Sequence, residues 1–114
     1  MKLKSKIGQI RLYDRRTGRV KVWKGYSFHD NDFTDHPLAI YSMERGKWHI
    51  LEKHSGCIID KPGVRYRTKQ EALDAVEDQY VMLLEMIKER PGVYEKAVER
   101  FREASNRYRG KEND

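Results

Sequence analysis

The stretch YRTKQEALDAVEDQYVMLLEMIKER, residues 66–90, decides the fold, because it has the pattern of a long, capped amphipathic helix. Thr68 and Glu71 have the spacing of a capping box, in which each side chain bonds a backbone amide near the start of the helix. Apolar residues then recur every three or four positions, as on one face of a helix, at Leu73, Val76, Tyr80, Leu83 and Ile87. Pro91 ends the run, since proline lacks the amide that a continuing helix needs. The stretch therefore predicts a helix over 68–90 that packs on the preceding residues.

The residues before this helix have the signals of an antiparallel sheet. Residues 7–23 predict a β-hairpin around a turn at 14–18, and further strands are expected over 38–43, 48–53 and 57–60. Residues 24–37 follow neither period and predict a loop. After the long helix, a second helix is expected from Pro91 to Arg109, ending at Gly110. The predicted fold is α+β, with an antiparallel sheet of four to five strands packed by the long helix and a second C-terminal helix that folds back.

Length and charge limit the possible classes of protein. The 114 residues predict a single domain over 1–110, with a flexible basic arm at 1–6 and a disordered tail at 111–114. No apolar run reaches the roughly 18–20 residues that span a bilayer, so we expect no membrane association. The single cysteine, Cys57, fits a cytoplasmic protein. Residues 1–27 hold nine Lys and Arg against one Asp, a net charge of +8, which favours a nucleic acid or an acidic protein surface as the partner.

The predicted hairpin is the main candidate for nucleic-acid binding. Strand alternation with a five-residue turn puts Ile10, Leu12, Val20 and Val22 on one face and a basic, aromatic set on the other. The candidate contacts of this hairpin are Arg11, Tyr13, Arg15, Arg16, Arg19, Lys21, Trp23 and Lys24. Arg and Lys side chains neutralise phosphates, and aromatic rings stack on bases. The alternative is a solvated face of an edge hairpin, where Lys and Arg prevent aggregation.

A second motif supports DNA. The residues Gly46-Lys-Trp48, then Gly56, then Tyr66-Arg-Thr-Lys-Gln-Glu-Ala72 resemble the arm-type DNA-binding domain of phage and transposon integrases, over about residues 46–80. In that family a three-stranded sheet lies in the major groove and leads into a helix. The resemblance implies that Trp48, Lys53, Arg65 and Arg67 lie near DNA. The chain departs from the family at residues 57–60, which are apolar rather than basic, and in the extra hairpin that precedes the motif.

Signals for metal or enzyme chemistry are poor. The loop from His29 to His36 holds several carboxylate, amide and imidazole groups, but it matches no calcium-loop spacing and is ordinary turn chemistry. His49, His54 and Cys57 lack the paired spacing of a zinc site. The sequence has no nucleophile elbow and no phosphate-binding glycine loop. We therefore expect no metal site, no cofactor and no enzyme activity.

Two functions follow from these patterns. The first is a small non-enzymatic nucleic-acid-binding protein, with DNA favoured over RNA. The alternative is a protein-interaction module, because small α+β proteins of this character are similar to accessory proteins of phages and mobile elements, some of which inhibit host defence nucleases. Its contact surface would be the apolar C-terminal half of the long helix, including Met82 and Met86. We expect the second helix to fold back and cover this surface; otherwise a partner or a second copy covers it.

Overall fold

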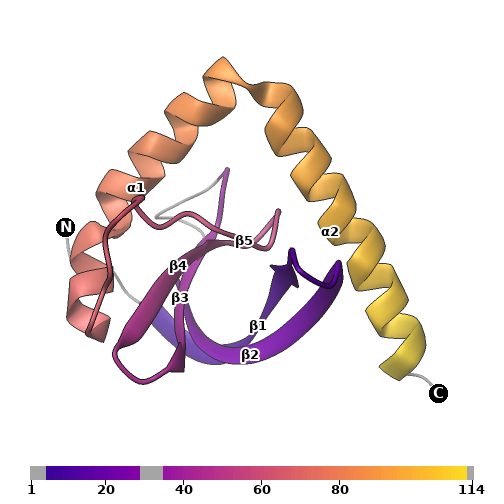
Figure 1. Cartoon of the computed structure of the whole chain (residues 1–114), viewed down its shortest axis with the longest axis horizontal. Helices are drawn as coiled ribbons and strands as arrows, with labels where there is room; N and C mark the ends of the chain where they lie inside the picture. The colour runs from indigo at the N-terminus through magenta and orange to yellow at the C-terminus, as the bar shows by residue number, and fades with distance from the viewer. Residues whose placement is uncertain (1–4, 29–34, 113–114) are drawn as a thin grey trace.

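The computed structural model describes residues 5–28 and 35–112 and has an α+β architecture (Figure 1). The chain forms β1 (Ser5–Asp14), β2 (Arg19–Phe28), β3 (Leu38–Glu44), β4 (Lys47–Glu52), β5 (Cys57–Ile58), α1 (Lys69–Glu89) and α2 (Pro91–Glu112). Strands that are neighbours in sequence are neighbours in one antiparallel five-stranded sheet. The predicted fold class is confirmed.

The sheet is strongly curved, so that β1 lies next to the turn between β4 and β5. The amide of Tyr13 in β1 donates to the carbonyl of Gly56, just before β5, over 2.8 Å. Gly25 in β2 makes the tight curve possible, because a Cβ there would lie 2.8 Å from the side chain of Ile10. The inner side of the coiled sheet is filled by a buried cluster of Ile10, Leu12, Ala39, Tyr41 and Leu51. The sheet is therefore a partly closed barrel with its own small core.

Helix α1 packs on the outer side of β3 and β4. Its buried positions Ala72, Val76 and Leu83 join the larger core cluster, together with Phe28, Leu38, Ile40, Ile50 and Tyr66 from the sheet and the segment before the helix. Both sides of the central strands are thus buried, which explains why Leu38 to Tyr41 form an unbroken apolar run.

The capping box predicted at the start of α1 is present in modified form. The Thr68 hydroxyl accepts the Glu71 amide over 3.1 Å, so Thr68 is the N-cap. The Glu71 carboxylate accepts the amide of Arg67 over 2.6 Å, one residue before the expected cap amide. The pair still satisfies two amides at this end of the helix.

The register of the β1–β2 hairpin differs from the prediction. Asp14 pairs with Arg19, so the turn holds the four residues 15–18 rather than five. A shift of one residue moves every side chain of a strand to the other face relative to its partner. Lys21 and Trp23 therefore share the inner side with Leu12 and Ile10, while Arg11 and Tyr13 share the outer side with Val22 and Val20. The prediction of one basic, aromatic hairpin face is wrong.

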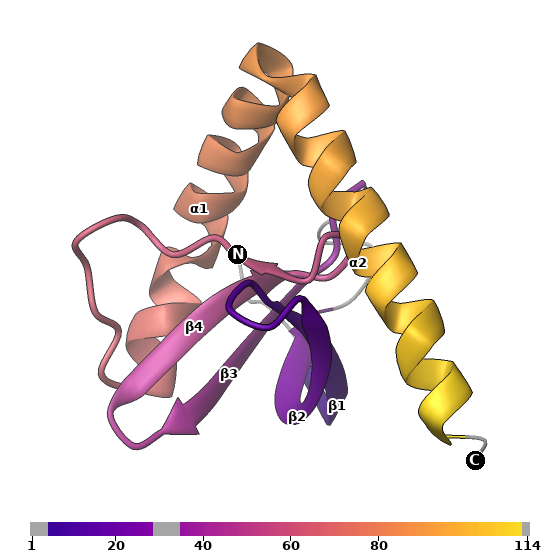
Figure 2. The same cartoon turned by 45° about the vertical axis from the view of Figure 1, so that its right-hand side comes forward.

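Helix α2 begins at Pro91 as predicted but continues through Gly110 to Glu112, beyond the predicted end at Arg109. It diverges from α1 and runs beside the hairpin instead (Figures 1 and 2), where Phe101 and Ala104 pack on Val20 of β2. The prediction that α2 covers the surplus apolar face of α1 is therefore wrong. Met82 is 45% exposed and Met86 is 36% exposed.

Two predicted irregular segments are partly strand. β1 begins at Ser5, within the expected arm, and β2 extends to the buried Phe28, within the expected loop at 24–37. The remaining predictions for residues 1–4, 29–34 and 113–114 lie outside the described residues. Among the described residues, no helix is long and apolar enough to cross a membrane.

Candidate nucleic-acid interface

The turn of the hairpin is organised by Asp14. Its carbonyl accepts the Gly18 amide over 2.8 Å, and its carboxylate accepts the Arg16 amide over 3.0 Å and pairs with Lys21 over 3.1 Å. Gly18 has a positive φ of 70°, which glycine adopts without strain. The bond from Lys21, then that from the Arg16 amide, lowers the pKa of Asp14 below its ordinary value. The turn is therefore held in one shape that exposes Arg15 and Arg16.

The C-terminal half of α2 lies against this turn and adds a second source of positive charge. The Arg107 guanidinium donates to the carbonyl of Gly18 over 3.4 Å. The Arg11 guanidinium stands 5.6 Å from the ring centre of Tyr108, a cation–π distance. Between the two elements is a hollow of about 400 Å³, lined by Arg19, Val20, Ala104, Arg107 and Tyr108.

We call Arg15, Arg16, Arg19 and Arg107 the basic edge. They come from two elements almost ninety residues apart, as the separation of Gly18 and Arg107 shows. All four are exposed, and no carboxylate within the described residues forms an ion pair with any of them. Guanidinium groups in this state keep their donors available for an external anion. The geometry suits contact with phosphates.

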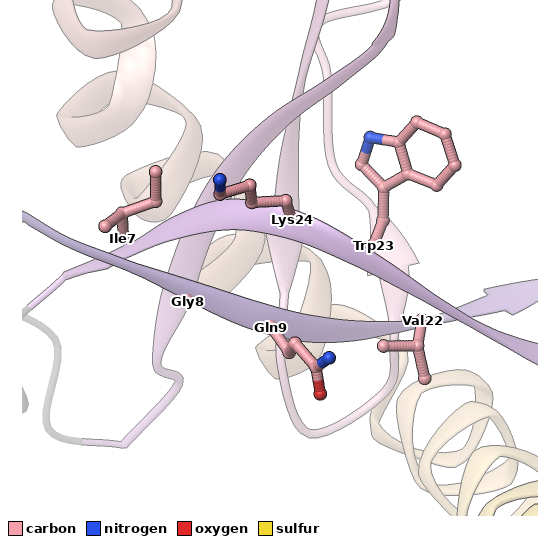
Figure 3. Close-up of a pocket in the computed structure, with 6 residues that line it drawn as sticks. All are labelled: Ile7, Gly8, Gln9, Val22, Trp23 and Lys24. Carbon is pink, nitrogen blue, oxygen red and sulfur yellow. The ribbon is translucent and has the colours of Figure 1, made fainter.

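The other hairpin residues predicted to contact nucleic acid do not form one continuous surface with the basic edge. Figure 3 shows that Trp23 and Val22 project from opposite sides of β2. The Trp23 indole donates to the carbonyl of Ser42 in β3 over 3.0 Å and is 39% exposed, so its ring is fixed against the sheet. Lys21 is engaged by Asp14. Lys24 is exposed and lines a hollow of about 530 Å³ beside Ile7.

The residues implied by the integrase resemblance lie elsewhere. The Trp48 and Tyr26 rings contact each other in a tilted arrangement, with ring centres 6.2 Å apart, and the backbone amide of Trp48 donates to the carbonyl of Tyr66. Arg65 donates to the carbonyl of Gly46 in the turn between β3 and β4, over 3.1 Å. Arg67 is exposed at the start of α1, and Lys53 is half-buried after the other end of β4. On β3 and β4 the sheet side opposite α1 is buried against β1.

Two of the residues weighed as zinc ligands have other partners. The His49 ring bonds the Asp60 carboxylate over 2.7 Å, and that carboxylate also accepts the Ile50 amide. The Cys57 thiol contacts the Ser55 carbonyl over 3.4 Å. Beside them, burial raises the pKa of Tyr41, and the charge of Asp60 raises it further. Tyr41, His49 and Cys57 line a hollow of about 420 Å³ together with the turn residues Asp14 and Arg15.

Sequence reasoning placed Arg15, Arg16 and Arg19 at the tip of the hairpin but missed Arg107 and its neighbour Tyr108. Tyr108 follows Phe101 and Ala104 at helical spacing, so the sequence indicates that these residues share one face of the second helix. The element on which that face packs was not visible, because helix periodicity identifies a face and not its partner. Comparisons of the chain with protein-family models, curated proteins and solved structures found no match.

Proposed function

We propose that this chain is a non-enzymatic nucleic-acid-binding protein that uses the basic edge to contact phosphates. The observation that carries the proposal is the contact of Arg107 with the hairpin turn, which brings it beside Arg19 at one hollow, next to the exposed turn residues Arg15 and Arg16. Within the described residues, none of the four has a carboxylate partner. Phosphate contacts by Arg supply most of the affinity of such proteins and require no base-specific geometry.

The aromatic residues near the basic edge favour a duplex as the ligand. Single-strand binding relies on exposed rings on which bases stack. Here the Trp23 indole is bound to Ser42, and Tyr13 and Tyr108 are half-buried between α2 and the hairpin. We therefore expect DNA or RNA duplexes, recognised through the backbone, to bind more tightly than single strands, with double-stranded DNA as the first ligand to test.

The test compares two triple variants with the same loss of charge. The first replaces Arg15, Arg16 and Arg19 by Ala. The control replaces Arg45, Arg65 and Arg67 by Ala. These residues lie at the turn between β3 and β4 and in the segment that leads into α1, and both elements are far from α2 (Figure 1). We expect the first triple to weaken binding of a labelled duplex and to lower the slope of log affinity against log salt by about 0.9 for each lost contact.

The control variant separates this proposal from the integrase-like alternative. A larger loss in the Arg45, Arg65 and Arg67 variant would place the nucleic acid at the residues implied by the resemblance. Equal losses in both variants would indicate a response to net charge alone, and the basic edge would not be the site. Circular dichroism of each variant would show that the fold is retained.

Protein interaction is a second candidate function, favoured by the apolar surface where α1 ends and α2 begins. The exposed apolar side chains there are Val81, Met82, Leu84, Met86 and Val93. Several exposed apolar side chains on one short segment are typical of interaction sites when they form a continuous patch. We expect a homodimer in light scattering if a second copy covers this surface, and Met82→Glu should then yield monomers. A wild-type monomer would contradict self-association.

A further inference from the structure

The last residue of β4, Glu52, is a carboxylate with no exposed surface. One of its oxygens, Oε1, accepts the Ser55 amide over 2.8 Å and the Tyr94 hydroxyl over 3.2 Å. The other, Oε2, accepts the His54 amide over 2.9 Å. A carboxylate has about four lone-pair positions, so one position on Oε2 stays open.

No Lys or Arg within the described residues pairs with Glu52. The group nearest to its open position is the His54 ring, whose Nδ1 lies 3.9 Å from Oε2, too far for a hydrogen bond. Buried carboxylates are normally paired with a cation or coordinate a metal, because an isolated buried charge is costly. Within the described residues, the Glu52 carboxylate is held by three hydrogen bonds and by no cationic side chain, which leaves an acceptor position for a cation.

Two histidines border this gap. His36 precedes β3, and His54 lies in the turn after β4. Each of His36, Glu52 and His54 offers one ligand atom, and the three atoms lie within 4.8 Å of one another. Residues from two separate segments thus bring two imidazoles and one carboxylate to one point beside the first turn of α2.

Tyr94 links His36 to Glu52 and orients the His36 ring. The His36 Nδ1 forms a hydrogen bond of 2.9 Å with the Tyr94 hydroxyl, which also donates to Glu52 Oε1 over 3.2 Å. Metal-binding histidines are commonly oriented by a hydrogen bond to one ring nitrogen.

We propose that His36, Glu52 and His54 form a binding site for a divalent transition metal ion, with Zn²⁺ as the expected occupant. Two His and one Glu are a ligand set of zinc sites that keep a fourth position for solvent. Ligand atoms at about 2.0–2.1 Å from zinc lie roughly 3.3 Å apart, so the three groups need only close by an ångström or so. The His54 side chain is 54% exposed and can make this movement.

The ligand types decide which ions bind. Imidazole nitrogen favours zinc, copper, nickel and cobalt, whereas magnesium and calcium prefer oxygen ligands. The site has two nitrogen donors and one carboxylate, so Mg²⁺ and Ca²⁺ should not compete. The proposal is independent of nucleic-acid binding, because the basic edge contributes no ligand.

The test is isothermal titration of the untagged, chelator-treated protein with Zn²⁺. The matched variants are His54→Ala and His49→Ala, since His49 also lies beside a carboxylate but outside the cluster. We expect one Zn²⁺ per chain for the wild type, at least about tenfold weaker binding for His54→Ala, and unchanged binding for His49→Ala. Co²⁺ should give visible absorption bands with the wild type that His54→Ala abolishes.

Two outcomes would overturn the proposal. One is that the wild type shows no saturable Zn²⁺ binding, or binds Zn²⁺ only with a Kd above about 100 μM. The other is equal Zn²⁺ affinity of the wild type and His54→Ala. Circular dichroism checks that His54→Ala is folded, and His54→Asn replaces it if it is not. Titration of the wild type with Mg²⁺ should give no saturable heat, and binding equal to that of Zn²⁺ would also contradict the proposed ligand set.

Discussion

The packing of α2 on the barrel can be tested at Gly56, where a single added methyl group meets Phe101. Gly56 has a φ of +64°, and a Cβ there would lie 2.5 Å from the Phe101 ring. Ala in the left-handed region costs roughly 1–2 kcal/mol. Overpacking adds about 1–3 kcal/mol, because the ring must shift or α2 must move outward. Gly56→Ala should therefore lower the free energy of unfolding by about 2–5 kcal/mol, a large share of the 5–15 kcal/mol of a typical domain.

Gly63 supplies the matched control. Its φ is +79°, but no atom lies within 4 Å of the position of an added Cβ. Gly63→Ala should cost only the backbone strain of roughly 1–2 kcal/mol. The difference between the two variants, about 1–3 kcal/mol, reports the contact with Phe101 and should move the urea midpoint by about 1 M at an ordinary m value.

A double-mutant cycle makes the attribution specific. In a Phe101→Ala background the ring is absent, so Gly56→Ala should cost no more than Gly63→Ala. Urea unfolding followed by circular dichroism measures all five proteins, including the wild type. The account of α2 packing would be refuted if Gly56→Ala and Gly63→Ala destabilise the wild type equally, or if the Gly56→Ala cost is unchanged without Phe101.

Three further perturbations test separate parts of the structure. Thr68→Ala removes the hydroxyl that accepts the Glu71 amide and should lower the free energy of unfolding by about 1 kcal/mol, measured by urea unfolding, whereas Thr68→Asn should retain most of it. The folded pKa of Asp14 lies below its unfolded value, so its contribution is fully present at neutral pH and is lost progressively as the pH falls from about 4 through the folded pKa; the stability difference between Asp14→Asn and the wild type, followed by unfolding across this range, should shrink with it. Tyr94→Phe removes one donor from the buried Glu52 carboxylate and should cost about 1–3 kcal/mol, and an unchanged unfolding midpoint would contradict the hydrogen bond.

Local sequence signals predicted the helices and their ends well, because residues close together in sequence determine where a helix begins and ends. The Thr68 cap, the Pro91 break and the apolar stripe of α1 all depend on neighbouring residues, and each lies where the pattern indicated. The hairpin faces were wrong for the opposite reason. Asp14 looks like a turn residue, yet it pairs with Arg19, and the difference of one residue inverts the relation between the two strands.

The two candidate sites could be predicted only in part, since both depend on tertiary packing. The basic edge needs Arg107, which reaches Gly18 because Phe101 and Val20 dock the helix there. The metal cluster joins His36 to Glu52 and His54 across the ends of β3 and β4, at a spacing that matches no short motif. Strand register and helix docking, which no single-sequence pattern specifies, decide both.

The most direct test of nucleic-acid binding is fluorescence anisotropy of labelled double- and single-stranded DNA and RNA, titrated with the wild-type chain across a range of salt concentrations. The account predicts that duplexes bind more tightly than single strands. It also predicts that log affinity falls linearly with log salt, with a slope that decreases when Arg15, Arg16 and Arg19 are replaced by Ala. Absence of binding at low salt, or a slope unchanged in that variant, would contradict it and would favour an acidic protein surface as the partner of the basic edge.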